Sequence, residues 1–285
     1  WFLYIVSCIL AGGSLVAFLA YGLKPGIDFT GGSLLEVTWN ETRPQTDALQ
    51  KIFVEQGIVG PVVQSVGEKE TLFRFTCVTE EKHQALTQAL TKLGALTENR
   101  FETIGPAIGK ELQQKAIWSV LLVIIAIMIY VAWAFRHVSR PIASWKYGII
   151  TIISLIHDVL LPIGVFAIAG RFFGVEITSA FIVALLTVLG YSVNDTIVVF
   201  DRIRENLSRL GTTLSFDEII DRSVTQTFAR SVNTTLTTLL SLIAIFFFGG
   251  ESIRYFALAL IIGIASGAYS SICVASPLLA SWYRV

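Results

Sequence analysis

The sequence predicts an α-helical membrane protein that crosses the bilayer six times and carries one small α+β domain outside it. Two observations support this fold class. The 285-residue chain is 54% hydrophobic and only 15% charged, whereas soluble domains carry about 25% charged residues, and its mean hydropathy is +0.69. Six apolar runs of spanning length leave a single polar segment that is long enough to fold by itself.

Each apolar run is long enough to cross a hydrocarbon core, which takes about 20 residues in a helix. We expect all six to be helical because lipid offers no hydrogen-bond partner for a free backbone amide. The first run, within residues 1–22, carries no charge and is expected to be a retained anchor rather than a signal peptide. The other five are expected within residues 116–285, at about 116–135, 147–169, 177–200, 231–249 and 255–279.

Short basic loops give the expected orientation. The loop after the second span carries Arg136, His137 and Arg140 without an acid, and four arginines lie at 202–222, after the fourth span. By the positive-inside rule these loops are cytoplasmic, and so are both termini. The polar segment, residues 23–115, is then expected on the extracytoplasmic (periplasmic) side.

The polar segment has the pattern of a small mixed domain. Its strands are expected at 33–39, 61–66, 71–78 and 101–104, and its helices at 44–56 and 80–93. The order βαββαβ is that of a ferredoxin-like sandwich. The segment contains no His/Cys/Asp cluster and no nucleophile–base arrangement, so we expect no catalytic residue, no metal and no cofactor.

Ionisable residues interrupt the apolar runs at three places. A charge at the centre of a spanning helix costs about 2.5–3.5 kcal/mol on insertion scales, and it marks a functional site by default. Asp195 lies in the fourth run, four residues after Tyr191 and eight after Thr187, so the three share one helix face bordered by Asn194. Such a polar stripe indicates a helix face turned to a wet cavity or a partner helix rather than to lipid.

The second place is Arg230, at the start of the fifth run. It begins a polar face with Asn233, Thr234 and Thr237, which recur at spacings of three and four. The fourth span ends on the side where the fifth begins, and Asp195 lies about 9 Å from that end at ~1.5 Å per residue. We therefore expect Asp195 and Arg230 to approach each other, with snorkelling of Arg230 to the interface as the alternative.

The third place is His157-Asp158, halfway along the third run. A hydrogen bond that packs two helices together is the structural alternative to a functional role for both residues. Gly263 and Gly267 are spaced by four in the sixth run and are expected to allow close helix packing.

Some classes of function find no support. The net charge is zero, so bulk charge gives no indication of nucleic-acid binding. The sequence has no Gly-rich phosphate loop followed by Lys-Ser/Thr, which argues against nucleotide hydrolysis.

Several motifs, in order, resemble the SecD/SecF family of bacterial protein-export membrane subunits. GIDFTGG, with Gly26, Asp28, Gly31 and Gly32, resembles the signature after the family's first span, and IGPAIGKEL at 104–112 resembles its approach to the second. His157-Asp158, GYSVNDTIVVFDRIREN at 190–206 and RSVNTTLTT at 230–238 resemble the SecF pattern rather than the SecD pattern. The resemblance covers essentially the whole chain. The GIDFTGG glycines are expected to form a turn that joins helix to strand, with Asp28 as its cap.

The resemblance implies half of an RND-type unit, in which two six-helix halves combine, with SecD as the other half, either separate or fused upstream. It implies an accessory, non-enzymatic subunit of the Sec translocase in the bacterial inner membrane, which uses the proton motive force to assist late preprotein export through SecYEG. YajC and YidC are further implied partners. The implied proton pathway includes Asp195, Arg230, Asn194, Thr234 and Thr237, with His157, Asp158, Tyr191 and Asn233 as secondary candidates.

Three alternatives stay open. An RND-type exporter of small molecules needs a much larger external domain than this one. An intramembrane aspartyl protease needs Gly-x-Gly before its aspartate, whereas Ser-Val-Asn precedes Asp195. A passive translocon scaffold needs no ion path. Coupling to Na⁺ in place of H⁺ also stays open.

Overall fold

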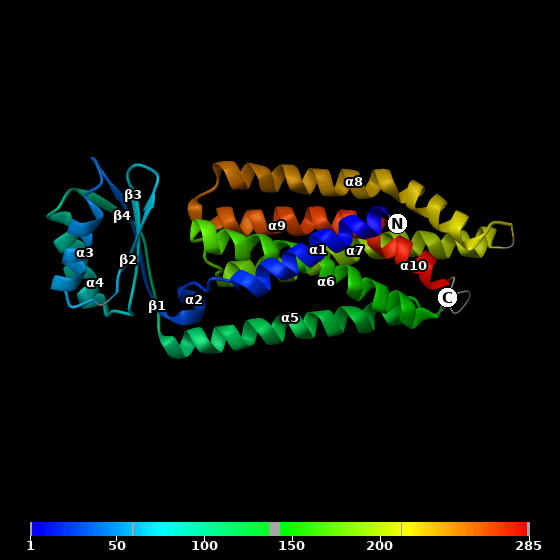
Figure 1. Cartoon of the computed structure of the whole chain (residues 1–285), viewed down its shortest axis with the longest axis horizontal. Helices are drawn as coiled ribbons and strands as arrows, with labels where there is room; N and C mark the ends of the chain where they lie inside the picture. Colours follow the sequence, from blue (N-terminus) through cyan, green and yellow to red (C-terminus); the bar gives the residue numbers. More distant parts are fainter. Residues whose placement is uncertain (1, 59, 137–142, 212, 284–285) are drawn as a thin grey trace. The chain divides into compact units, whose positions relative to one another are not determined.

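The computed structural model describes residues 2–58, 60–136, 143–211 and 213–283. It divides into two compact units (Figure 1). The helical unit comprises Trp1–Lys24 and Ile117–Val285, and the sheet unit comprises Pro25–Ala116. His137 and Arg140, used above for the orientation, lie outside the described residues.

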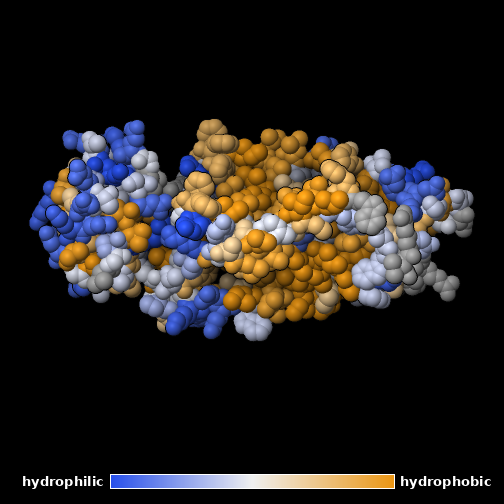
Figure 2. Space-filling view, viewed as in Figure 1, coloured by the Kyte–Doolittle hydropathy of each residue, from blue (hydrophilic) through white to orange (hydrophobic). Residues whose placement is uncertain are grey.

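Six helices of the described chain have the length and composition of membrane spans, so the predicted fold class is confirmed. They are α1 (Phe2–Tyr21), α5 (Pro106–Ala134), α6 (Ser144–Phe173), α7 (Ser179–Leu210), α8 (Phe216–Phe248) and a composite last span. This last span consists of α9 (Glu251–Ser270), the π-helix η1 (Ser271–Ala275) and α10 (Ser276–Tyr283). The face of the helical unit that Figure 2 shows is mainly hydrophobic, as expected for helices that face lipid.

Three helices extend well beyond the apolar runs that predict them. α5 begins at Pro106 rather than near 116. α7 continues through the charged segment to Leu210, and α8 begins at Phe216 rather than near 231. A capping box fixes this start, because the Ser215 hydroxyl accepts from the Glu218 amide and the Glu218 carboxylate accepts from the Ser215 amide. Buried Asn206 of α7 donates to Ser223 of α8 at 2.8 Å, which joins the two extensions. Apolar patterning alone missed these polar turns because they are stabilised by caps and hydrogen bonds.

α7 and α9 pack closely at small residues. A Cβ atom added at Gly267 would lie 2.9 Å from Cβ of Ser192, and one added at Gly263 would overlap the Val188 side chain. The predicted packing role of both glycines is therefore confirmed. This contact brings the backbone of α9 against the buried face of α7, where Ser192 and Asp195 lie.

The sheet unit contains β1 (Gly32–Trp39), α3 (Thr46–Glu55), β2 (Val62–Val66), β3 (Glu70–Phe75), α4 (Glu80–Thr91) and β4 (Leu96–Ile104). The strands pair antiparallel in the order β2-β3-β1-β4. Its core joins Leu35 and Trp39 of β1 with Phe53 of α3 and Leu86 and Leu90 of α4. The element order and the sheet order are compatible with the expected ferredoxin-like sandwich.

The GIDFTGG segment packs on the beginning of α5. It forms the short helix α2 (Ile27–Thr30), followed by Gly31 and Gly32, whose φ angles are +73° and +135°. A Cβ atom at Gly31 would lie 2.7 Å from Cα of Pro106. Gly26 precedes α2 with φ at −80°, so its conformation does not require glycine, and the N-cap position belongs to Gly26 rather than to Asp28. The GIDFTGG and IGPAIGKEL segments thus form one packed corner, which their separation in sequence did not reveal.

Candidate functional site: two buried carboxylates

Asp195 lies on the buried face of α7, and two serine hydroxyls donate to its carboxylate. Ser231 of α8 donates to Oδ1 at 2.6 Å, and Ser271 of η1 donates to Oδ2. The side chain of Asp195 is 9% exposed. A carboxylate has about four acceptor positions, so these two bonds leave Asp195 with acceptor capacity on both oxygens.

The structure does not form the expected contact between Asp195 and Arg230. Among the ion pairs of the described residues none joins these two side chains, and Arg230 is exposed. The residue that α8 places against Asp195 is Ser231, the next one along the chain. Adjacent helical residues point about 100° apart, so only one of this pair reaches the interior.

The predicted polar face of α8 is exposed on the helical unit. Arg230, Asn233, Thr234 and Thr237 are all exposed. Thr234 donates to the carbonyl of Arg230 at 2.8 Å, and Thr237 to that of Asn233 at 3.0 Å. The hydroxyls of these threonines are therefore satisfied within their own helix, and among the described residues neither is bonded to Asp195.

The predicted stripe on α7 lies only partly inside. Thr187 and Asn194 are exposed, Tyr191 is half-buried, and Asp195 is buried at the edge of the stripe. The Tyr191 hydroxyl lies 3.3 Å from Oγ1 of Thr238 on α8. The outward faces of α7 and α8 thus both carry polar side chains beside the buried carboxylate, although these helices are built to cross a membrane.

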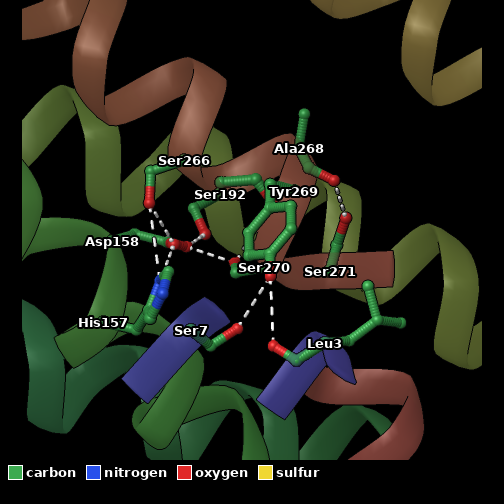
Figure 3. Close-up of polar contacts among 11 residues, drawn as sticks. Leu3, Ser7, His157, Asp158, Ser192, Ser266, Ala268, Tyr269, Ser270 and Ser271 are labelled. Carbon is green, nitrogen blue, oxygen red and sulfur yellow. Dashed lines mark hydrogen bonds and ion pairs between the residues drawn. The ribbon is translucent and has the colours of Figure 1, made fainter. Parts of the chain in front are cut away.

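Asp158 forms a second, more enclosed network (Figure 3). It is fully buried, and its Oδ2 accepts from Ser192 of α7 at 2.5 Å and from Ser270 of α9 at 2.6 Å. Its Oδ1 accepts from Ser266 of α9 at 2.8 Å and lies 3.0 Å from Nδ1 of His157. The interhelical hydrogen bonding that is the structural alternative for Asp158 is therefore present, to two helices at once.

The hydroxyl of Tyr269 extends this region toward α1. It lies 3.0 Å from the hydroxyl of Ser7 and donates to the carbonyl of Leu3 at 3.2 Å (Figure 3). The Tyr269 ring stacks beside the His157 ring with centroids 6.1 Å apart. Helices α1, α6, α7 and α9 therefore meet at one polar cluster.

Sequence reasoning missed the serines that bind the carboxylates. They are Ser192, Ser231, Ser266, Ser270 and Ser271. Serine is common in membrane helices, and its hydroxyl can bond its own backbone, so a single serine gives little signal. The spacing of four between Ser266 and Ser270, followed at once by Ser271, was the one pattern available in the sequence.

The chemistry of this site is that of carboxylates and hydroxyls. Among the residues that the structure describes, no group of three or more His, Cys, Asp or Glu side chains could hold a metal ion. A serine hydroxyl donates to an ionised carboxylate and can rotate to accept from a protonated one. Such a network can therefore hold a carboxyl group in either protonation state when its hydroxyls turn.

Together, the fold and these networks define a polytopic membrane protein with titratable groups held inside its helical unit. The family model for the protein export membrane protein SecD/SecF, C-terminal, matches residues 84–285, and the model for the SecD/SecF GG motif matches residues 16–38. The chain belongs to the SecD/SecF family of protein-export membrane proteins. The prediction of this family is confirmed.

Its relatives cover nearly the whole chain. The protein translocase subunit SecF of Thermobaculum terrenum is 41% identical over 98% of this chain and 90% of its own length, and that of Anaerolinea thermophila is 38% identical over 98% and 91%. The protein translocase subunit SecDF of Thermus thermophilus is 36% identical over 98% of this chain and 37% of its own length. These relatives are named as translocase subunits, which is a transport role.

Solved structures of SecDF have the same fold over this length. The crystal structure of the Thermus SecDF, described as a translocon-associated membrane protein, matches 99% of this chain with a TM-score of 0.84 and 36% identity. A structure of SecDF in its super-membrane-facing form matches 99% with a TM-score of 0.67 and 35% identity. The chain spans 37% of each of those longer chains.

Proposed function

We propose that this chain is the SecF-type half of a protein-export unit in which the protonation of Asp195 links the proton motive force to late steps of preprotein export. The main observation in support is that Asp195 is buried in a membrane span and accepts hydrogen bonds from hydroxyls of two other helical segments. An ionisable group in such a place is expensive to insert, and it marks a functional site by default.

The other half of the unit is a SecD-type partner. The helical unit exposes polar side chains on α7 and α8 that lipid would not accommodate well, notably Asn194, Arg230 and Asn233. The segment that matches is only 37% of the SecDF relative, so that protein has further chain in which a second half can lie. A partner helix packed on this polar face would bring further polar groups to the edge of the Asp195 site, and Arg230 with them.

The proposed mechanism follows from the donors at Asp195. In the ionised form, Ser231 and Ser271 both donate to the carboxylate. When the carboxyl gains a proton, the protonated oxygen becomes a donor and a weaker acceptor, so the hydrogen bond that it receives from its serine weakens or reverses. Because Ser231 belongs to α8 and Ser271 to η1, protonation changes the contacts that these two segments make with α7. If these helices have two packed arrangements, protonation favours one of them, and in this way a local change of charge drives a conformational change.

The proposed placement is the inner membrane of a bacterium, with both termini in the cytoplasm. Residues 1–22 and 116–285 form the membrane part, and residues 23–115 form the extracytoplasmic domain that receives the conformational change. The proposed assembly includes SecYEG, a translocating preprotein and, from the family resemblance, YajC and YidC.

The test is stimulation of preprotein export in vesicles that contain the Sec channel, this chain and a SecD-type partner, with and without a proton gradient. Asp195→Asn should abolish the part of the stimulation that needs the gradient. Asp201→Asn is the matched control, because Asp201 is on the same helix but exposed and paired with Arg204. Full stimulation by Asp195→Asn would leave the passive scaffold as the better account, and drug extrusion in place of export would favour the small-molecule exporter.

A further inference from the structure

We propose that Nε2 of His157 is a second proton-binding atom in the helical unit and that it is coupled to Asp195 through the adjacent hydroxyls of Ser270 and Ser271. This inference rests on the proposed proton-linked function and extends it to a second site. It is built on the donors of Asp158, the free nitrogen of His157 and the position of the two serines.

The surroundings of Asp158 suit an ionised carboxylate. Its two oxygens have four partners, which are the hydroxyls of Ser192, Ser266 and Ser270 and the imidazole Nδ1 of His157. Four donors fill the acceptor positions of an ionised carboxylate. In the ionised form of Asp158 all four partners can donate at once.

The charge of Asp158 has no fixed cation opposite it. The apolar parts of the helices packed on α6, residues 2–21, 117–134, 179–200 and 255–283, carry neither lysine nor arginine, and α6 carries none in 147–170. A buried charge is strongly unfavourable unless it is paired. The side chain in contact that can become a cation is His157, whose Nδ1 lies 3.0 Å from Oδ1.

The geometry of His157 leaves one ring nitrogen as a base. With Asp158 ionised, Nδ1 carries the hydrogen because a carboxylate only accepts, and Nε2 then presents a lone pair. The side chain is 6% exposed, and its Nε2 is buried with no hydrogen-bond partner in the described part of the chain. A proton on Nε2 takes the His157-Asp158 pair from a net charge of −1 to zero, and the proton comes from water or from another titrating group.

Ser270 and Ser271 connect the two sites. They are consecutive, yet Ser270 donates to Asp158 on α6 and Ser271 donates to Asp195 on α7. The π-helix η1 begins at Ser271, and the Ser276 hydroxyl donates to the Ser271 carbonyl at 2.9 Å. Single π turns inside α-helices are frequent at functional sites. A shift of this turn moves both hydroxyls, so the charge on one carboxylate changes the donors available to the other.

The surrounding titratable groups are few. α9 contributes Tyr269 beside the His157 ring, α7 contributes Asp195, and η1 contributes Cys273. α1 contributes Tyr4, whose hydroxyl lies 3.0 Å from that of Ser281, and the exposed Cys8. α10 contributes Tyr283, which stacks on Phe216. Within this set, Asp195 is the group that changes charge under the proposed function.

The direct test is nitrogen NMR of the imidazole rings in the full chain, reconstituted in lipid vesicles. The chain has three histidines, and His157→Gln assigns the resonances of His157. We expect Nδ1 of His157 to stay protonated while Nε2 changes from bare to protonated as the pH falls. A Nε2 that keeps one state over the whole pH range in which the protein stays folded would overturn the proposal. So would a bare Nδ1.

The coupling has its own test. Asp195→Asn should move the pH midpoint of the His157 transition by about 0.5 to 2 pH units. In the Ser270→Ala/Ser271→Ala double variant the same Asp195→Asn change should move it by less than half as much. If the double variant does not fold, Ser271→Ala alone serves, because it removes one end of the link. If Asp195→Asn left the pH midpoint of the His157 transition unchanged, the coupling would be overturned.

The two proposals fail separately. If Asp195→Asn lost proton flux but Nε2 of His157 kept one protonation state at every pH, the second site would be overturned and the proposed function would stand. A titrating His157 together with full proton flux in Asp195→Asn would overturn the proposed function instead.

Discussion

The hydroxyl of Ser231 donates a 2.6 Å hydrogen bond to the carboxylate of Asp195, across the interface of α7 and α8. Ser231 directly follows Arg230, whose side chain is exposed. α8 therefore presents two consecutive residues to different surroundings, one to the buried carboxylate and one to the outer face of the helical unit. This division of roles separates the predictions for the two residues.

Removing the Ser231 hydroxyl should weaken both folding and function. Ser231→Ala leaves Asp195 with Ser271 as its hydroxyl donor, and loss of a hydrogen bond to a charged group costs about 1.5–3 kcal/mol. We expect a lower thermal unfolding midpoint in detergent and a smaller gradient-dependent export stimulation. Ser231→Thr keeps the hydroxyl and should retain most of both. If Ser231→Ala matched the wild type in both measurements, the bond would have no role.

Arg230→Ala should separate function from stability. The side chain is exposed, and surface substitutions usually change the free energy of unfolding by no more than about 0.5 kcal/mol. We expect an unchanged unfolding midpoint for the isolated chain but reduced export stimulation when the SecD-type partner is present. Arg209→Ala is the control, since Arg209 is also exposed. It lies on α7, where it pairs with Glu205. Equal stimulation by both variants would contradict a role for Arg230 at the partner interface.

A methyl group at Gly263 should disturb the packing of α7 against α9. Its Cβ would overlap the side chain of Val188, and overpacking a close contact costs about 1–3 kcal/mol. The unfolding midpoint of Gly263→Ala should fall, whereas Gly190→Ala should change it little because no atom lies within 4 Å of that added Cβ. Equal midpoints for the two variants would contradict the close packing of α7 against α9 at Gly263.

A methyl group at Gly31 should destabilise the sheet unit. Gly31 has φ at +73°, and an added Cβ would lie 2.7 Å from the Pro106 backbone. Gly57 has φ at +68°, but its Cβ would meet nothing within 4 Å. Both substitutions to alanine incur the backbone cost of a left-handed residue, about 1–2 kcal/mol, and only Gly31→Ala adds the clash. Proteolysis of the segment between the first two spans should therefore be faster in Gly31→Ala than in Gly57→Ala. Equal rates would contradict the packed corner.

Hydrophobic patterning was sufficient for most of the fold. Six apolar runs predict six helices because the length of a span is set by the bilayer, and alternation in β1 predicts a strand because its inner face holds Leu35, Val37 and Trp39. The polar ends of α7 and α8 were not predicted, because a cap at Ser215 and side-chain hydrogen bonds, rather than apolar residues, extend these helices.

The site was predicted less completely. Single ionisable residues in apolar runs pointed to Asp158 and Asp195, since their insertion is costly. Which groups surround them depends on the rotation of each helix, and helical periodicity alone does not fix that rotation. An error of one position exchanged Ser231 for Arg230 as the partner of Asp195. The π turn at Ser271, which directs Ser270 and Ser271 to different carboxylates, has no signature in the apolar pattern.

Proton flux tests the role of Asp195 most directly. Vesicles containing this chain and a SecD-type partner are given a pH gradient, and an internal pH indicator follows proton entry. We expect flux in the wild type and in Asp201→Asn, and background leakage alone in Asp195→Asn with the protein still folded and inserted. Wild-type flux through Asp195→Asn would contradict the account.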